Sequence, residues 1–222
     1  MSVRDRFLRI SARCWHRVKY ADGWEWILRS NAIEGWLQDS EAYELYRLAK
    51  HFTPETEPVA VELGSFKGKS SVMLAGGLKE KKKAKLYCID PFGKDEDSDE
   101  QRKIYDPILA RDQRGLREIF EESISHSGVS HLVFAIQGYS FEIARSWNMP
   151  IDLLFIDASH AYPLVLRDFE TWFPFVKPHG VVAFHDANGI HPGPTRVVAE
   201  RLIAPAFSSV HSAGSVAWAQ KL

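Results

Sequence analysis

Short apolar runs alternate with amphipathic segments along most of this chain. The runs are rich in valine, leucine, isoleucine and phenylalanine and contain few polar interruptions, which is typical of strands buried on both faces of a parallel sheet. Five runs predict strands, at residues 59–62, 86–89, 132–136, 151–156 and 181–184. Two segments near the C-terminus, 207–211 and 216–220, are candidates for a hairpin.

Between the runs, apolar residues recur at helical spacing. This spacing predicts helices within residues 40–52, 71–78, 116–120, 141–147 and 163–176, and beyond Pro194. The alternation of strand and helix, without an internal repeat, predicts an α/β fold with a doubly wound, mostly parallel seven-stranded sheet. The two C-terminal candidates would add an antiparallel hairpin to it.

The first 20 residues differ from the rest of the chain in charge. They carry six arginines and lysines against one acid, and Val3, Phe7, Ile10 and Cys14 fall at helical spacing. This predicts a basic amphipathic helix that packs on its own domain or on a second copy of the chain, so a homo-oligomer is one expectation. Contact with a membrane surface is an alternative that we do not favour.

Three tryptophans follow closely, Trp24, Trp26 and Trp36, and indicate a packed cap or a wall of a substrate site. We therefore divide the chain into N-terminal helices and a tryptophan-rich cap, residues 1–34, and a main domain, residues 35–222. At 222 residues the chain is long enough to bury a full hydrophobic core.

Composition excludes several classes of protein. Hydrophobic residues make up 45% and charged residues 26%, and the net charge of −1 gives no general attraction for nucleic acid. No apolar run approaches the length that spans a membrane. Cys14 and Cys88 form no metal or disulfide pattern, so a cytoplasmic location is expected.

The stretch VAVELGSFKGKSS, residues 59–71, places a glycine loop between a strand and a helix, as cofactor sites of α/β sheets do. Its glycines, Gly64 and Gly68, fit neither phosphate-binding motif. The Walker spacing is one residue short, and Phe66 replaces the middle glycine of the dinucleotide motif. Glu62 would repel a phosphate but suits S-adenosylmethionine, which is cationic. A plain turn between strand and helix is the alternative.

Several predicted strands end at an acidic or hydroxyl side chain: Glu62, Asp90, Ser140, Asp157 and Asp186. Ligands of such sheets bind outside the carboxyl ends of the strands, so these side chains are expected around one site. Asp90 would accept both ribose hydroxyls of the cofactor, although it could also be a turn residue before Pro91. Ser140 would line the cofactor, cap the next helix, or do both.

The motifs DASH and HDAN, at the ends of two strands, predict a metal site. Asp157, Asp186 and the amide of Asn188 are hard oxygen ligands suited to Mg²⁺ or a similar ion. His160 lies on the turn that leaves its strand, where it could act as the base for a bound hydroxyl. The structural alternatives are that His160 caps the next helix and that His185 is a buried, hydrogen-bonded histidine.

With these residues the chain resembles the class I S-adenosylmethionine-dependent O-methyltransferases. It looks like the small bacterial branch grouped with macrocin-type sugar methyltransferases, and more distantly like catechol O-methyltransferase. The resemblance spans residues 35–222 and is carried by VELGSFKGKSS, CIDPFG, GYS, FIDASHAY and HDAN. It implies a Rossmann-like methyltransferase fold. It also implies cofactor-binding roles for Glu62, Gly64, Ser70, Asp90, Ser140 and Asp157, with Ser65 and Gly68 in the same loop.

Two departures from the catechol-type pattern concern the catalytic centre. His160 stands where that pattern has a lysine base, three residues after the first metal-binding aspartate. The second metal motif there is Asp-Asn, whereas here Ala187 separates Asp186 from Asn188. The third metal ligand, and the metal itself, therefore stay open.

The expected reaction is methyl transfer from S-adenosylmethionine to a hydroxyl of a small molecule or sugar, with Asp157 and His160 as catalytic residues and a divalent metal assisting. Three other functions stay open: a P-loop-like nucleotide hydrolase, an iron-dependent hydroxylase-like enzyme, and a non-catalytic module that binds the cofactor. Acceptor specificity is expected in residues 24–36, 91–114 and 189–194, which carry no readable motif.

Overall fold

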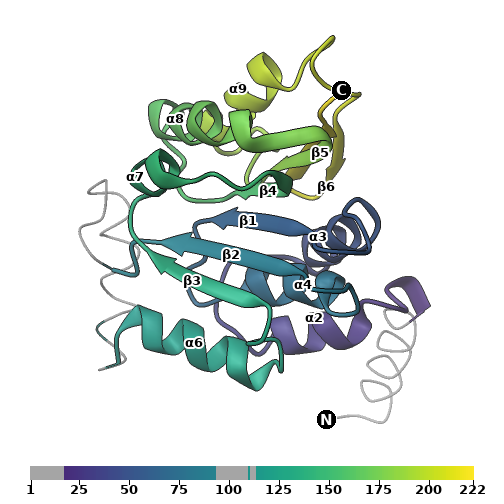
Figure 1. Ribbon diagram of the computed structural model, residues 1–222, viewed down its shortest axis with the longest axis vertical. Helices are drawn as coiled ribbons and strands as arrows, with labels where there is room; N and C mark the ends of the chain where they lie inside the picture. The colour runs from purple at the N-terminus through teal and green to yellow at the C-terminus, as the bar shows by residue number, and fades with distance from the viewer. Residues whose placement is uncertain (1–17, 94–109, 111–113) are drawn as a thin grey trace, which may run out of the picture.

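The structure is a computed structural model and describes residues 18–93, 110 and 114–222 (Figure 1). At its centre is a seven-stranded sheet with the order β3-β2-β1-β4-β5-β7-β6. Strands β1 to β5 are parallel, and β7 is antiparallel to both β5 and β6. This confirms the predicted fold class. The strands are β1 (Val59–Leu63), β2 (Lys85–Asp90), β3 (Val133–Gln137), β4 (Ile151–Ile156), β5 (Val176–Phe184), β6 (His211–Ala213) and β7 (Val216–Gln220).

Helices cover both faces of the sheet and form a hydrophobic cluster with each. On one face lie α2 (Trp24–Ser30), α3 (Asp39–His51), α4 (Lys69–Leu78) and α6 (Leu116–His126). On the other lie α7 (Ser140–Ile143), α8 (Tyr162–Trp172) and α9 (Pro192–Arg201), with 3₁₀ turns at Ala144–Ser146 and Phe173–Phe175. Helices α8 and α9 pack side by side (Figure 1).

Strand β4 shows how one segment contributes to both clusters. All of its residues are buried. Because successive side chains of a strand point to opposite faces, Leu153 and Phe155 enter one cluster, and Leu154 and Ile156 enter the other. Burial on both faces explains why this segment reads as a nearly continuous apolar run, with Asp157 as the first residue after it.

Part of the predicted N-terminal cap belongs to the main core. The ring of Trp26 lies against Gly76 of α4 so closely that a Cβ on Gly76 would come within 2.3 Å of it. Ile27, in the same helix as Trp26, is fully buried. The division at residue 34 stays a prediction. The predicted basic helix, residues 1–20, lies outside the described residues except for its last three positions.

Two strand boundaries predicted in the C-terminal half of the chain are wrong. The sixth strand is β6 rather than residues 207–211, where Phe207 makes only an isolated β-bridge. Phe207 is hydrophobic because it packs against Phe169 and Phe173, with ring centroids 6.4 and 5.3 Å away. The fifth strand begins at Val176, which the helical spacing assigned to the preceding helix.

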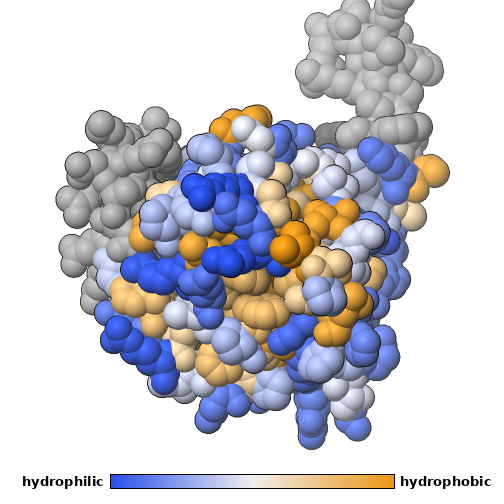
Figure 2. Space-filling view, turned by 90° about the horizontal axis from the view of Figure 1, so that it is seen from above, coloured by the Kyte–Doolittle hydropathy of each residue, from blue (hydrophilic) through white to orange (hydrophobic). Residues whose placement is uncertain are grey.

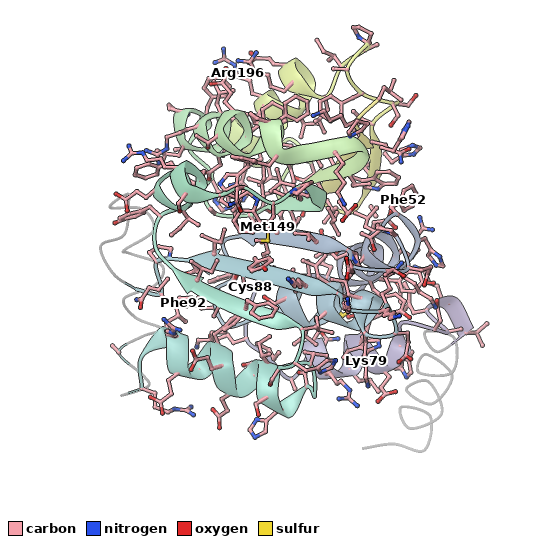
Figure 3. The ribbon with its side chains drawn as sticks, in the orientation of Figure 1. Phe52, Lys79, Cys88, Phe92, Met149 and Arg196 are labelled. Atoms are coloured by element: carbon pink, nitrogen blue, oxygen red, sulfur yellow. The ribbon has the colours of Figure 1, made fainter. Side chains whose placement is uncertain are left out.

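Helix α6 packs against the segment that follows β2. Phe92 follows β2, and its ring lies 5.3 Å from that of Phe120 in α6 (Figure 3). Most of the loop predicted at residues 91–114 lies outside the described residues. The face of the molecule seen from above carries hydrophobic residues interspersed with hydrophilic ones (Figure 2). Within the described part of the chain, no helix is long and apolar enough to cross a membrane.

Candidate active site

A cavity of about 520 Å³ opens at the carboxyl edge of the sheet. Its wall combines residues that follow β1 to β5 with parts of α4 and α8 and with the segment before α3. Among the predicted site residues, its wall contains Gly64, Ser65, Ser70, Asp90, Ser140, Asp157, His160 and Asp186. Glu62, Gly68 and Asn188 are not part of this wall.

The glycine loop after β1 depends on backbone conformations that favour glycine. Gly64 and Gly68 have φ angles of 86° and 92°. At Gly64 a Cβ would lie 2.4 Å from the carbonyl oxygen of Asp157, so only glycine lets the loop pass this close to the end of β4. Gly68 is the N-cap residue of α4 and turns the chain into that helix. Its role is therefore to shape the loop rather than to line the cavity.

Asp90 holds the loop from the neighbouring strand. Its Oδ2 accepts hydrogen bonds from the amides of Ser65 (2.8 Å) and Phe66 (2.9 Å), and its Oδ1 accepts one from the amide of Phe92 (2.6 Å). The loop amides that would bind a phosphate in a P-loop are thus directed at a carboxylate. Asp90 also lines the cavity, where its remaining lone pairs could accept ribose hydroxyls.

Glu62 lies behind the loop. It is fully buried, and its Oε2 accepts a hydrogen bond from the hydroxyl of Ser71 in α4. Burial raises the pKa of Glu62 and so favours its neutral form. The predicted direct contact between Glu62 and a cationic ligand is not supported by this placement, because the carboxyl group faces α4 instead of the cavity.

Ser140 connects the end of β3 to α8. Tyr139, not Ser140, is the N-cap residue of α7, so the predicted capping role is wrong. The hydroxyl of Ser140 donates a hydrogen bond to the carboxylate of Asp168. Asp168 is only 3% exposed but lines the cavity together with Ser140. This pair therefore fixes the wall on the side of β3.

An imidazole and three carboxylates meet beyond β4 and β5. His185 Nδ1 lies 3.2 Å from Asp157 Oδ1 and 3.2 Å from Asp186 Oδ2. On the other side of the ring, Nε2 lies 3.5 Å from Glu41 Oε2. His185 is 5% exposed, which confirms the alternative that it is a buried, hydrogen-bonded histidine.

The surrounding acids make His185 a cation. Burial alone would lower the pKa of His185, but the charge of Asp157 and hydrogen bonds to Asp157, Asp186 and Glu41 raise it to about 12. Burial alone would raise the pKa of Glu41, but hydrogen bonds from His185 and from two backbone amides lower it to about 2. The opposite shifts show that the ionised forms stabilise one another.

Glu41 also joins α3 to the C-terminal strands. Its Oε1 accepts a hydrogen bond from the amide of Ser215 (2.7 Å), just before β7, and its Oε2 accepts one from the amide of Gln38 (2.8 Å). One helical turn later, Glu44 accepts a hydrogen bond from the indole N–H of Trp218 in β7 (2.9 Å). Glu41 is therefore held by backbone amides from two distant segments, one at the start of α3 and one just before β7.

His160 forms a second pair with Asp186. Its Nε2 lies 2.9 Å from Asp186 Oδ2, and this hydrogen bond raises the pKa of His160. Burial would raise the pKa of Asp186, but the contacts with His160 and His185 lower it. The ring of His191 lies 4.0 Å from that of His160, at an interplanar angle of 31°.

The start of α9 brings His191 to this place. A Cβ on Gly193 would lie 2.1 Å from the carbonyl oxygen of His160, so the missing side chain allows the two segments to touch. The hydroxyl of Thr195 donates a hydrogen bond to the carbonyl oxygen of His191 (2.8 Å). Farther along α9, the guanidinium of Arg196 lies 4.0 Å over the ring of Tyr162 in α8 (Figure 3).

The predicted Mg²⁺ ligands are brought together only in part. Asp157 and Asp186 converge, but Asn188 is exposed, and its Oδ1 accepts a hydrogen bond from the amide of Ile190 (3.2 Å). His185 Nδ1 lies 3.2 Å from both aspartates and compensates their charge. These residues do not fit the predicted all-oxygen site, because a nitrogen occupies the position where that site needs its third oxygen.

Two residues of the site, Glu41 and His191, are not predicted there by any motif in the sequence. Glu41 lies in a helix that is far from the strand ends along the sequence, and it belongs to no motif. His191 lies within residues 189–194, where specificity but no chemistry is predicted. The available signal was the pattern HPGP, in which a histidine directly precedes a proline that can begin a helix.

A family model described as "Methyltransferase domain" matches residues 61–187, more than half of the chain. The matched span contains the glycine loop, Asp90, and the centre formed by Asp157 and Asp186. The chain belongs to this methyltransferase family. The match does not favour the nucleotide hydrolase, hydroxylase and non-catalytic alternatives.

Solved methyltransferase structures share the fold of this methyltransferase. The S-adenosylhomocysteine-bound methyltransferase PaMTH1 from Podospora anserina is 13% identical, with a TM-score of 0.64, and the match covers 100% of this chain and 97% of that one. The O-methyltransferase from Bacillus cereus in complex with S-adenosylhomocysteine is 16% identical, with a TM-score of 0.59 and coverage of 84% and 83%. TomG from Streptomyces achromogenes, an O-methyltransferase in complex with S-adenosylmethionine, is 18% identical, with a TM-score of 0.58 and coverage of 84% and 81%.

Two curated proteins resemble the methyltransferase in sequence. "Uncharacterized protein R132" of Acanthamoeba polyphaga mimivirus is 27% identical over 127 residues, which is 57% of this chain and 50% of that protein. "Uncharacterized protein y4gI" of Sinorhizobium fredii is 47% identical over 38 residues, 17% of this chain and 4% of that protein. The chain thus spans about half the length of the first and a small part of the second.

Proposed function

We propose that this methyltransferase transfers the methyl group of S-adenosylmethionine to a hydroxyl of a small molecule or sugar. The observation that carries the proposal is the His160–Asp186 pair, with 2.9 Å between Nε2 and Oδ2, on the wall of the same cavity as the glycine loop. A hydroxyl needs a positioned base to take its proton as the new bond forms. The O-methyltransferases from Bacillus cereus and Streptomyces achromogenes, which share the fold, support this acceptor class.

In this proposal the cofactor lies between the glycine loop and the strand ends. Asp90 would bind the ribose, because its carboxylate faces the cavity and is fixed by three backbone amides. Ser140 would lie at the nucleobase of the cofactor, and Asp157 would lie at its methionine end. Gly64 allows close approach of the cofactor, since no side chain separates the loop from the end of β4.

The acceptor would lie between His160 and an aromatic rim. Trp36 lines the cavity and is 57% exposed, and its ring lies 5.5 Å from that of Phe66. Aromatic faces offer apolar area to planar molecules and to the apolar faces of sugar rings. This placement supports the predicted role of Trp36 as part of a substrate wall.

The reaction would be a displacement at the methyl carbon. The acceptor oxygen bonds to this carbon while the carbon–sulfur bond breaks, and the sulfur leaves with the electron pair as a neutral thioether. His160 takes the proton of the hydroxyl. Because Nε2 faces Asp186, the neutral ring carries its own proton there, and Nδ1 is the atom that accepts the new one. Asp186 then stabilises the imidazolium.

Calorimetry with S-adenosylhomocysteine, followed by transfer assays with methyl-labelled S-adenosylmethionine, tests the proposal. We expect binding in the micromolar range, no binding of ATP or NAD, and transfer to hydroxyl compounds in an acceptor panel of phenols, sugars and their amine counterparts. Consistent preference for an amine over the matching hydroxyl would contradict the proposed acceptor class but not the methyltransferase family.

A further inference from the structure

We propose that His160, Asp186 and His191 form a binding site for a transition-metal ion. Each of the three residues offers one ligand atom, and these atoms all lie within 4.8 Å of one another. Two imidazole nitrogens and one carboxylate oxygen suit Zn²⁺, Co²⁺, Ni²⁺ or Fe²⁺, whereas Mg²⁺ favours oxygen ligands. The site therefore differs from the predicted Mg²⁺ site in both ligands and metal class. It depends neither on the cofactor nor on the identity of the acceptor.

The spacing between His160 and Asp186 is close to that of two ligands on one ion. Zn²⁺ binds nitrogen and oxygen at about 2.0–2.2 Å, so two ligand atoms on one tetrahedral ion lie roughly 3–3.5 Å apart. His160 Nε2 and Asp186 Oδ2 are 2.9 Å apart, close to this separation. His191 completes the set, because its ligand atom lies within 4.8 Å of the other two and its ring centroid lies 4.0 Å from that of His160.

The backbone around the three ligands is fixed by contacts of its own. The contact between Gly193 and the carbonyl oxygen of His160 joins the two histidine-bearing segments. The hydroxyl of Thr195 accepts a hydrogen bond from the amide of Gly189 (2.9 Å) and donates one to the carbonyl oxygen of His191, which holds the intervening turn. His185 Nδ1 contacts Asp186 Oδ2 from the opposite side, as groups outside a metal's ligand set orient its ligands.

A second group, Asp157, His185 and Asp186, also has ligand atoms within 4.8 Å of one another. Its histidine side chain is only 4% exposed, and each ring nitrogen faces carboxylates. The side chain of His160 is 45% exposed, which leaves room for the water or exchangeable ligand that an accessible metal keeps. We therefore assign the ion to the group that contains His160 and His191.

Metal binding and proton transfer by His160 exclude each other. The ion would bind Nε2, the nitrogen that faces Asp186. A neutral imidazole bound to metal through Nε2 carries its proton on Nδ1, so Nδ1 can no longer accept a proton from a hydroxyl. The site can thus hold a metal ion or provide a base, but it cannot do both at once.

The test measures metal binding by the full-length protein after removal of any affinity tag and of bound metal by a chelator. Cobalt absorption spectra and Zn²⁺ calorimetry report binding directly, with Mg²⁺ as the comparison ion. We expect one high-affinity Co²⁺ or Zn²⁺ ion per chain and no comparable Mg²⁺ binding. His191→Ala should weaken binding at least about tenfold. The matched control His126→Ala, at an exposed position in α6, should leave binding unchanged.

Cooperative thermal melting is the folding control for every variant, and His191→Gln is the second variant if His191→Ala fails it. Failure of the wild-type protein to bind Co²⁺ or Zn²⁺ while it binds S-adenosylhomocysteine would overturn the proposal. Metal binding that survives His191→Ala but is lost in Asp157→Asn would also overturn it, because the ion would then belong to the other group. Neither result touches the proposed methyl transfer, which the transfer assay measures separately.

Discussion

Glu41 Oε2 lies 3.5 Å from His185 Nε2, although 144 positions separate the two residues along the chain. The contact joins α3, on one face of the sheet, to the end of β5. Asp157 and Asp186 lie on the other side of the same imidazole, each 3.2 Å from Nδ1. Removal of Glu41 would leave Nε2 of this buried imidazolium without its carboxylate partner, which costs more than the loss of an exposed ion pair.

Glu41→Gln should destabilise the protein at neutral pH and much less in acid. The pKa of Glu41 is about 2 in the folded protein, below its ordinary value of 4.5, so its stabilising contribution is present above pH 4.5 and is lost as the pH falls through 2. The shift corresponds to roughly 3 kcal/mol at neutral pH. Urea unfolding of wild type and variant across this range measures it, with Glu80→Gln at an exposed position as the control. A difference that does not change with pH would count against the ionised Glu41–His185 pair.

Gly64→Ala should destabilise the glycine loop. The new Cβ would lie 2.4 Å from the carbonyl oxygen of Asp157, and the φ of 86° is strained for alanine. We expect a loss of at least about 2 kcal/mol in the free energy of unfolding. Gly115→Ala is the matched control, because nothing lies within 4 Å of its Cβ position and its φ is −68°. Thermal melting of both variants decides whether the close approach at Gly64 matters.

Asp90→Asn and Glu62→Gln should affect cofactor binding differently. Asp90 accepts two amide hydrogen bonds from the glycine loop, and an amide group cannot replace both of its oxygens, so S-adenosylhomocysteine binding should weaken by about 1–3 kcal/mol. Glu62 faces α4 and favours its neutral form, which glutamine resembles in shape. Its replacement should change affinity by less than about threefold. Calorimetry compares the two, and an equal loss would place Glu62 against the cofactor after all.

His160→Ala should slow methyl transfer by roughly 10²–10⁴-fold, the usual contribution of a positioned base, while S-adenosylhomocysteine affinity stays unchanged. The reason is that His160 lines the acceptor side of the proposed site, and the contact of its Nε2 with Asp186 leaves Nδ1 to accept the proton. Single-turnover assays separate the chemical step from cofactor binding, with His126→Ala as the control. Transfer at the wild-type rate by His160→Ala would assign the proton to another group.

Zn²⁺ should inhibit methyl transfer by the wild-type protein, and a chelator should restore it. Metal on His160 Nε2 removes the base that accepts the proton of the acceptor. His191→Ala should require at least about tenfold more Zn²⁺ for the same inhibition, since it lacks one ligand. Rate measurements over a Zn²⁺ series give this comparison. Activation by Zn²⁺ would instead mean that the metal, and not His160, activates the hydroxyl.

The parallel sheet could be predicted because a strand buried on both faces appears in the sequence as a nearly continuous apolar run. The run at β4 is apolar except for Asp152, and Asp90 at the end of β2 and Asp157 after β4 do line the same cavity. Glu62 shows where this reasoning stops. Val61 and Leu63 enter the cluster on one face, so the intervening side chain must point to the other face, towards Ser71. The direction of the Glu62 side chain follows from this alternation, which a run buried on both faces does not reveal.

Asn188 lies apart from the other two predicted metal ligands for a different physical reason. Asp186 has a φ of 55°, so the chain turns sharply after β5 and carries Asn188 away from the cavity. The next histidine, His191, reaches the cavity because Gly193 lets the start of α9 contact the segment at His160. Contacts between distant segments, such as this one and that of Glu41 with His185, leave no pattern in the local sequence.

The hydrogen bond from Ser215 to Glu41 spans 174 positions and has a consequence for the order of events during synthesis. A ribosome releases the chain from its N-terminus, and domains begin to fold as they emerge. Strands β1 to β5 are available before β7, but the acid that supports His185 gains its last backbone partner only with Ser215. The charged centre can therefore reach its final arrangement only after the hairpin that follows β5 has left the exit tunnel.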